Sequence, residues 1–195
     1  MPDESDTTGT DSTTTNLETR DSTSPDSQDV VLRPLTVNDG AALWTLTRDS
    51  QVLDLNSSYY YLLWSRDFGS TSLLAERNGA PIGFVTGYLR PDEPRTLMIW
   101  QVAVSESARG VGLASLMLDE LVERTGADAL ETTITDDNQG SKALFASLAR
   151  RRGADHVVTA LFTPEMYPDG HDTEFLHRIE PLFGSDDANH DAGIR

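Results

Sequence analysis

The sequence predicts an α/β domain in which helices flank a mixed central sheet. The first observation is that β-rich runs alternate with helical patterns between residues 30 and 182. The second is an Asn-Gly pair at 78–79 between two β-rich runs, a pair typical of a tight antiparallel hairpin. The third is the order strand, helix, strand, helix, strand in the second half of the chain. Together these patterns favour a sheet with both parallel and antiparallel neighbours.

The first half of this domain is expected to hold four strands and two helices. Asn38-Asp39 can cap a helix that carries Leu43 and Leu46, and Ser57-Ser58 can cap a second helix. The run TLMIWQVAV is the longest β-rich stretch, so we expect it to lie in the centre of the sheet. The expected strands, in chain order, are residues 30–35, 72–76, 82–89 and 96–104.

The second half supplies the remaining elements. Residues 112–124 are predicted to form a helix because Leu113, Leu116, Met117 and Leu121 recur at helical spacing. The other expected elements are a strand at 129–135, a helix at 138–151 that ends at Gly153, and strands at 157–163 and 174–179.

The two ends of the chain differ from the part between them. Residues 1–29 contain thirteen Ser or Thr, eight acidic residues and one large aliphatic residue, Leu17. Such a segment cannot bury enough apolar surface to offset the entropy of ordering it. We therefore expect a disordered acidic tail at 1–29, a folded domain at 30–182 and a flexible tail at 183–195.

Charge and composition exclude several classes of function. The net charge of −17 would repel a phosphate backbone, so we expect no nucleic-acid partner. No apolar run approaches the roughly 18 residues of a membrane span, and the N-terminus lacks the basic and apolar regions of a signal peptide. The absence of cysteine excludes disulfides, thiolate metal sites and a cysteine nucleophile. We expect a cytoplasmic protein that needs no metal.

The segment most informative about chemistry is a turn between a strand and a helix. It reads Arg109, Gly110, Val111, Gly112, Leu113 and Ala114. Glycines at the start of a helix expose main-chain N–H groups, and the helix dipole adds partial positive charge, so a diphosphate can bind there. A P-loop is excluded because no lysine follows the glycines, and Ser115 stands where a dinucleotide fingerprint needs its third glycine. The alternative is a simple glycine turn.

This Arg-x-x-Gly-x-Ala pattern after a strand ending in VAV resembles the acyl-CoA loop of the GCN5-related N-acetyltransferases. The resemblance implies a GNAT fold in which two central parallel strands, 100–104 and 130–134, splay apart around acetyl-CoA. It also implies direct attack of an amine on the thioester, with no covalent enzyme intermediate. The implied acetyl-CoA contacts are Val102, Val104, the loop 109–114, Asn138 and Phe145. Phe145 stands where many members carry a tyrosine that protonates the leaving thiolate, which is a departure from the pattern.

Four longer stretches are similar to the diaminobutyrate acetyltransferases of ectoine biosynthesis. They are LDLNSSYYYLLWSRDF, GFVTGYLRP with LMIWQVAV, LETTITDDNQGSKALF, and GHDTEFLHRI. This likeness implies acetyl transfer from acetyl-CoA to the 4-amino group of L-2,4-diaminobutyrate. It also implies a homodimer.

Diaminobutyrate requires a site with an acid for an ammonium group, donors for a carboxylate and a wall that fixes its length. The candidate substrate-binding residues are Asp54, Tyr59, Trp100, Gln101, Thr132 and Thr133. Each also has a plain structural alternative: Asp54 as a helix-entry acid, Tyr59 as one of three neighbouring tyrosines, Trp100 as sheet packing, and the threonines as β-formers.

An attacking alkylammonium must lose its proton, because it is mostly charged at neutral pH. Glu131 is the first candidate base and His171 the second. The structural alternatives are an ion-pair role for Glu131 and a solvated loop position for His171. Two other functions remain open at this point: acetylation of another amine, such as a polyamine or a peptide N-terminus, and a non-catalytic acyl-CoA-binding module.

Overall fold

The computed structural model describes residues 30–184, in which seven strands form one sheet in the order β1-β2-β3-β4-β5-β7-β6. The strands are β1 (Val30–Pro34), β2 (Leu73–Arg77), β3 (Ala80–Leu89), β4 (Thr96–Val104), β5 (Ala129–Thr135), β6 (Asp155–Phe162) and β7 (Glu174–Glu180). The helices are α1 (Gly40–Ser50), α2 (Ser58–Asp67), α3 (Leu113–Thr125) and α4 (Gln139–Arg152). The β4–β5 pair is parallel and the other neighbouring pairs are antiparallel, so the predicted mixed sheet is confirmed.

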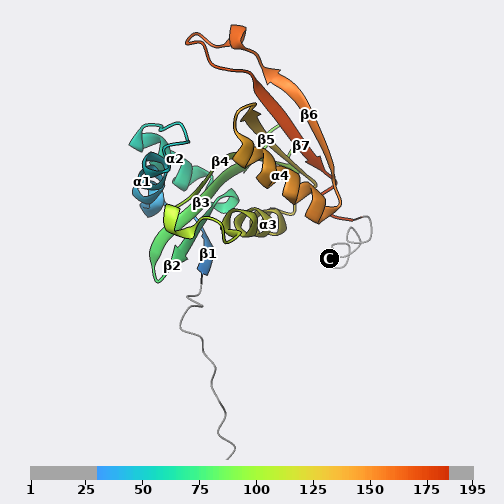
Figure 1. The fold of residues 1–195 in the computed structure, drawn as a ribbon. Helices are drawn as coiled ribbons and strands as arrows, with labels where there is room; N and C mark the ends of the chain where they lie inside the picture. The colour runs from blue at the N-terminus through green and yellow to red at the C-terminus, as the bar shows by residue number, and fades with distance from the viewer. Residues whose placement is uncertain (1–29, 185–195) are drawn as a thin grey trace, which may run out of the picture.

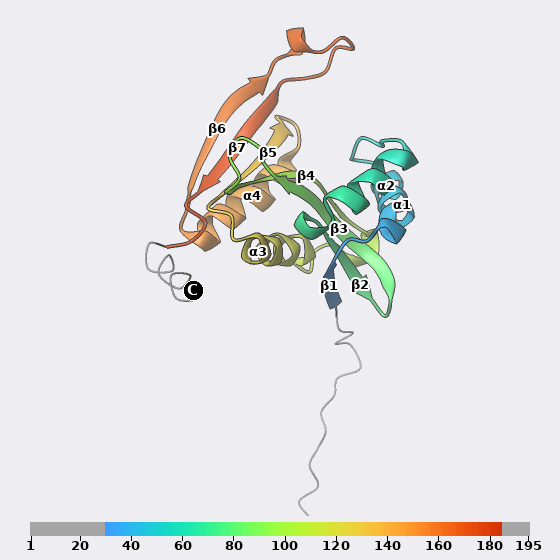
Figure 2. The same ribbon diagram turned by 180° about the vertical axis from the view of Figure 1, so that it is seen from behind.

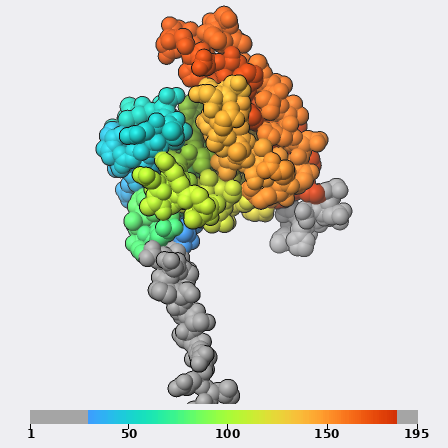
Figure 3. Space-filling model, viewed as in Figure 1, coloured from blue at the N-terminus to red at the C-terminus, as the bar shows by residue number. Residues whose placement is uncertain are grey.

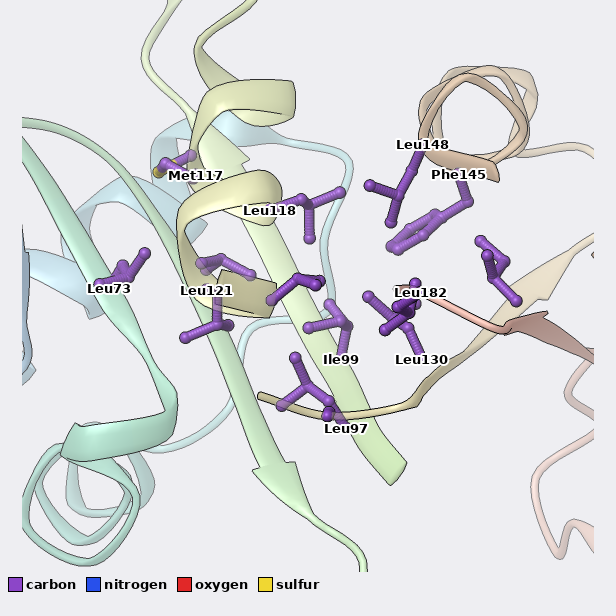
Figure 4. Packing of buried hydrophobic residues seen from close by; sticks show 14 of the residues in the cluster. Leu73, Leu97, Ile99, Met117, Leu118, Leu121, Leu130, Phe145, Leu148 and Leu182 are labelled. Atoms are coloured by element: carbon purple, nitrogen blue, oxygen red, sulfur yellow. The ribbon is translucent and has the colours of Figure 1, made fainter. Parts of the chain in front are cut away.

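Helices cover both faces of the sheet (Figure 1). One apolar cluster joins Leu43 of α1 and Tyr61 of α2 to Phe84 and Ala103 of the sheet. The larger cluster lies between the opposite face and the helices α3 and α4 (Figure 4). Its fully buried side chains include Leu97, Met117, Leu118, Leu121, Leu130 and Leu148. The helical spacing read in the sequence therefore corresponds to the buried side of α3.

The hairpin between β2 and β3 follows from its two turn residues. Asn78 and Gly79 have φ angles of 53° and 75°, and Arg77 pairs with Ala80 across the turn. Two consecutive left-handed residues make the turn that best matches the twist of antiparallel strands. The Asn-Gly prediction is confirmed.

A bulge in β4 determines the shape of the centre of the sheet. Thr86 pairs with Gln101 and Gly87 pairs with Ile99, so Trp100 is an extra residue without a partner on β3. A bulge bends its strand and can redirect a side chain. The bend shows in the packing, because Ile99 before it and Val102 after it both contact the α3–α4 cluster although they are three residues apart.

The parallel ladder between β4 and β5 ends at this bulge. Its last pair is Ile99 with Thr132, although β4 continues to Val104 and β5 to Thr135. Beyond that pair the main-chain groups of β4 that face β5 have no strand partner. The predicted splay of two parallel strands is confirmed from Trp100 on β4 and from Thr133 on β5. The expectation that it includes residues 130–132 is wrong, because these residues still pair with β4.

Strands β6 and β7 form a long antiparallel hairpin that extends beyond the rest of the sheet (Figures 1 and 2). A short 3₁₀ turn, Pro164–Met166, lies near its tip. We call residues 155–180 the arm. Residues 167–174, between the tip of the arm and the start of β7, lie over the ends of β4 and β5 and line the same cavity as these strands.

Of the two expected tails, the structure describes only the first residues of the C-terminal one. Residues 1–29 and 185–195 lie outside the described residues. Phe183 packs against the large core cluster, with the Arg152 guanidinium 5.7 Å from its ring centroid, so the folded part reaches past the expected boundary at 182. No helix in residues 30–184 is long and apolar enough to cross a membrane.

Candidate active site

A cavity of about 690 Å³ opens where β4 and β5 separate. Its walls come from both strands, the segment 52–56, the start of α4 and the tip of the arm. In the space-filling view the α1–α2 segment and α4 stand on opposite sides of this region, below the arm (Figure 3). The sequence-predicted residues that line it are Asp54, Trp100, Gln101, Val102, Thr132, Thr133, Asn138, Phe145 and His171. The fold thus brings together residues from five separate segments of the chain.

Trp100 and Gln101 enter the cavity from the bulge. Trp100 is 50% exposed and leans on the Tyr60 ring, with centroids 6.4 Å apart, so it forms a wall of the cavity. Gln101 is buried, and its Nε2 donates to the main-chain oxygen of Asp54 at 3.0 Å. Its Oε1 accepts from the Tyr61 hydroxyl at 3.3 Å. The side chain of Gln101 therefore bonds to protein on both ends.

Negative charge gathers on one side of the cavity. Asp54, Asp172 and Glu174 line it, and Asp54 lies close enough to Glu174 to raise the pKa of that carboxyl. Burial is the larger cause of the raised pKa of Glu174, while a hydrogen bond from the Thr133 hydroxyl acts in the opposite direction. Asp137 also lines the cavity and also raises the pKa of Glu174, so four carboxylates surround one hollow, which suits a ligand that carries ammonium groups.

The sequence analysis missed Glu174. The residue begins β7, three positions after His171, and only the fold of the arm turns it toward the cavity. A signal was present in the GHDTEF stretch, where a histidine and an acid stand three residues apart before a strand. Periodicity alone could not tell which face of that strand Glu174 would take.

His171 lies on the loop at the tip of the arm, beside this carboxylate. Its ring stacks on Tyr167 with centroids 4.5 Å apart, and its Nδ1 donates to the main-chain oxygen of Asp172 at 2.8 Å. That hydrogen bond, and then the charges of Glu174 and Asp54, raise the pKa of His171. With Nδ1 engaged, Nε2 is the nitrogen left to exchange a proton.

The structure corrects the expectation for Glu131. Its carboxylate accepts from Arg178 at 2.6 Å and from Arg90 at 2.9 Å, and it does not line the cavity. Glu131 lies in the closed part of the ladder, opposite Met98 of β4 and Arg178 of β7. Guanidinium groups donate to both oxygens of Glu131. The residue therefore has the ion-pair role that was its structural alternative, and not the role of the base.

Tyr59 also lies elsewhere than expected. Its side chain is 66% exposed and does not line the cavity. The inward face of α2 is taken by Tyr61 and Trp64, three residues apart, and this spacing turns Tyr59 outward. A substrate-binding role for Tyr59 is therefore not supported.

Thr132 and Thr133 stand at the point where β5 leaves β4. Thr132 is the last paired residue of the ladder, and Thr133 is the first beyond it. Both line the cavity, but neighbouring residues of a strand point to opposite faces, and the Thr133 hydroxyl already donates to Glu174. The hydroxyl of Thr132 is thus the one of the two that suits the carboxylate of a small amino acid.

The predicted diphosphate loop follows β4 after Ser105 and a 3₁₀ turn, Glu106–Ala108. Gly110 and Gly112 have φ angles of 78° and 82°, and a Cβ placed on either would point into open space. α3 begins at Leu113, so its first N–H groups have no carbonyl partner one turn back. This is the geometry of an anion cradle. Val104 and Arg109 line a second hollow of about 490 Å³ beside it, and Arg109 Nε donates to the Val104 oxygen at 3.3 Å.

Asn138 and Phe145 enter the cavity from the first two turns of α4. The Asn138 Oδ1 caps the helix by accepting from the Ser141 amide at 3.0 Å, which leaves its Nδ2 free to donate. Phe145 is buried and supplies an apolar wall without any proton. In the part of the chain that the structure describes, no group of three or more His, Asp or Glu side chains is arranged to hold a metal ion.

Comparisons with known proteins agree with this geometry. The family model described as acetyltransferase (GNAT) family matches residues 41–149. A Streptomyces coelicolor protein named L-2,4-diaminobutyric acid acetyltransferase is 54% identical over 152 residues, which are 75% of this chain and 89% of that protein. A protein of the same name from Marinococcus halophilus is 41% identical over 157 residues, 78% of this chain and 91% of that one.

Solved structures give the same picture. A diaminobutyrate acetyltransferase from Paenibacillus lautus, in complex with its substrate L-2,4-diaminobutyric acid and coenzyme A, superposes with a TM-score of 0.76. It is 38% identical, and the match covers 80% of this chain and 98% of that chain. A ribosomal-protein-S18-alanine N-acetyltransferase from Escherichia coli shares the fold alone, with a TM-score of 0.62 at 15% identity.

Proposed function

Because this chain belongs to the acetyltransferase (GNAT) family, and within it to the L-2,4-diaminobutyric acid acetyltransferases, we propose that it acetylates the 4-amino group of L-2,4-diaminobutyrate with acetyl-CoA, a step of ectoine biosynthesis. The observation that carries this proposal is that β4 leads to two binding sites, one for an amine and one for a diphosphate. An acid-lined cavity lies at its bulge, and an anion cradle follows its end.

The acetyl donor fits the groups that line the splay. The N–H groups at 110–114 would hold the diphosphate, and the main chain of Val102 and the N–H of Val104 would pair with the pantetheine, while the Val104 oxygen accepts from Arg109. Asn138 can donate to the pantetheine, and Phe145 packs beside it. In this proposal the thioester would lie near Trp100 and Thr133, which both line the cavity.

The amine acceptor fits the acidic side. Asp54 and Glu174 bind ammonium groups, and Asp172 adds to the negative potential. The Thr132 hydroxyl donates to the carboxylate, the Thr133 hydroxyl stays with Glu174, and Trp100 limits the length of the substrate. A shorter or longer diamine would leave a buried charge unpaired, which is how a site of this kind selects its substrate.

Before it can attack, the ammonium group must lose one proton to become a neutral amine. Glu174 is the group that takes it, because its raised pKa brings it nearer to neutrality and it faces the cavity. His171 can pass the proton on through Nε2, which lies 3.9 Å from Glu174 Oε1. The amine nitrogen then bonds to the thioester carbon and the carbon–sulfur bond breaks. The nitrogen gives its second proton to water, and the thiolate of CoA leaves and takes a proton from water.

The test is incubation of the purified chain with acetyl-CoA and L-2,4-diaminobutyrate, with NMR identification of the acetylated nitrogen. The proposal requires CoA release and acetylation at the 4-amino group. A panel with a polyamine and a peptide N-terminus separates it from an acetyltransferase for another amine. Binding of acetyl-CoA without CoA release with any amine would identify a non-catalytic module.

A homodimer is part of the proposal. β6 is an edge strand whose apolar side chains are exposed, among them Val157 at 56% and Phe162 at 44%. A long apolar edge strand is unfavourable on a lone subunit, and a second copy could cover it. Light scattering should give twice the chain mass, and Val157→Asp should shift the protein toward the monomer. We also propose the cytoplasm as its location, because acetyl-CoA is an intracellular metabolite.

A further inference from the structure

The segment that carries Asp54 has no helix or strand of its own. Residues 52–56 join α1 to α2 in an irregular path, yet Asp54 must keep its carboxylate at the cavity to bind an ammonium group. The main-chain oxygen of Asp54 accepts a 3.0 Å hydrogen bond from Gln101 Nε2. Gln101 lies on the bulge of β4, so this contact joins the irregular segment to the sheet.

The orientation of the Gln101 carboxamide is fixed by its two partners. A main-chain oxygen can only accept, so the NH₂ end must face Asp54. The other end accepts from the hydroxyl of Tyr61, which is fully buried in α2. A buried amide satisfied at both ends is rigid, because rotating it would leave both partners unpaired.

The main chain of Gln101 is held as firmly as its side chain. Its N–H donates to Thr86 Oγ1 at 3.1 Å, and its oxygen accepts from the same hydroxyl at 3.4 Å. Thr86 is buried on β3 beside the bulge. The bulge, the carboxamide and the Asp54 main chain therefore form one connected set of hydrogen bonds.

We propose that Gln101 is a positioning residue that acts through Asp54: its carboxamide fixes the Asp54 main chain so that the Asp54 carboxylate faces the substrate ammonium. The inference rests on the proposed diamine substrate. It replaces direct substrate binding as the role of Gln101, since both ends of its side chain already have protein partners.

A kinetic double-mutant cycle tests this role. Gln101→Glu keeps the shape, but when ionised it turns an acceptor toward the Asp54 oxygen; Asp54→Asn removes the carboxylate. With each single variant the KM for diaminobutyrate should rise about tenfold at pH 8.5, while the KM for acetyl-CoA stays within twofold. The double variant should match Asp54→Asn within about twofold, because Gln101 then has nothing left to position.

The pH profile gives a second readout that a merely structural role would not move. When the carboxyl introduced by Gln101→Glu is protonated, it can again donate to the Asp54 oxygen. The KM ratio of this variant to the wild type should therefore fall toward one as the pH is lowered from 8.5 to 6.5. The ratio cancels the titration of His171 and Glu174, which both enzymes share. Tyr61→Phe frees the carboxamide to rotate and should raise the diaminobutyrate KM two- to threefold, again without effect in the Asp54→Asn background.

Three results would each overturn the inference. The first is a double variant whose diaminobutyrate KM rises by the product of the two single effects. The others are an unchanged diaminobutyrate KM in Gln101→Glu, and a KM ratio of that variant to the wild type that does not change with pH. If Gln101→Glu proves to be unfolded by its thermal transition, the Tyr61→Phe and Asp54→Asn cycle decides alone. Failure of the wild-type chain to acetylate diaminobutyrate would instead overturn the proposed function, so the two failures are distinguishable.

Discussion

The Nε2 atom of His171 lies 3.9 Å from Oε1 of Glu174, and both side chains line the acid-rich side of the cavity. The pKa of Glu174 is raised chiefly by burial, and that of His171 chiefly by its hydrogen bond to the Asp172 oxygen. A carboxylate base works only after it has lost its proton. The rate should therefore rise with pH through the raised pKa of Glu174.

Glu174→Gln should lower kcat at neutral pH about 100-fold, because the amide cannot accept a proton. The acid limb of the wild-type kcat profile should disappear in the variant, and activity should recover at high pH, where the amine loses its proton without help. Stopped-assay kinetics from pH 5.5 to 9.5 measure both effects. An equal fractional loss at every pH would mean that Glu174 binds substrate without acting as a base.

Glu131→Gln serves as the matched control and is a prediction in its own right. The change leaves Arg90 and Arg178 without their buried partner, although both retain Glu93. We expect a loss of about 2 to 3 kcal/mol in the free energy of unfolding, since the two arginines are partly exposed to water. Urea unfolding measures this loss. The shape of the kcat profile should not change, and a lost acid limb here would return Glu131 to the role of base.

Gly112→Ala should weaken coenzyme binding at least tenfold, because its Cβ would enter the open space of the anion cradle and its φ of 82° disfavours any L side chain. Gly126→Ala is the matched control, with a φ of 59° at the other end of α3. Both should lose about 1 kcal/mol of stability. Calorimetry with CoA should separate them: equal affinities for the two variants would contradict a diphosphate site at 110–114.

Acidification should weaken the fold through two histidines of the arm. His156 Nε2 and His177 Nδ1 are 2.9 Å apart, and burial lowers the pKa of both below 6.5. The unfolded chain therefore takes up protons at a higher pH than the folded chain, and stability is lost as the pH falls through about 6.5. Urea midpoints should be flat from pH 8 to 7.5 and should fall between pH 7 and 5.5.

A His156→Gln and His177→Gln double variant should show a shallower fall. His171→Gln provides a control of opposite sign, because the pKa of His171 is raised in the folded chain and its protonation adds stability below the folded pKa. Removing His171 should therefore steepen the fall. Parallel midpoint curves for all three proteins would show that other groups dominate this pH range.

The sequence carried enough information to predict the fold because the main signals are local. The Asn78-Gly79 turn, the leucines of α3 and the helix end at Gly153 each act within a few residues. The splayed strands were predicted through resemblance, and the glycine loop through the chemistry of helix N-termini. The bulge at Trp100 was not foreseen, because it depends on the register between two strands and on the hydroxyl of Thr86.

The candidate site was predicted less completely, for a related reason. Alternation along β5 separates the faces of Glu131 and Thr132, but it does not say where the ladder with β4 ends. Only that end point decides that Glu131 is enclosed by arginines while Thr133 faces the cavity. Glu174 depends on the path of the arm, which no local pattern encodes.

The extra residue in β4 has a consequence at the level of the gene. Ile99 and Val102 already contact the same core cluster, so a chain lacking Trp100 would keep every later side chain of the strand on its present face. Loss of the Trp100 codon would leave a regular strand that could continue its parallel hydrogen bonding with β5. Deleting these three nucleotides would thus convert the open cleft into an uninterrupted sheet. The shortened protein should still fold, but it should lack the cavity that binds its substrates.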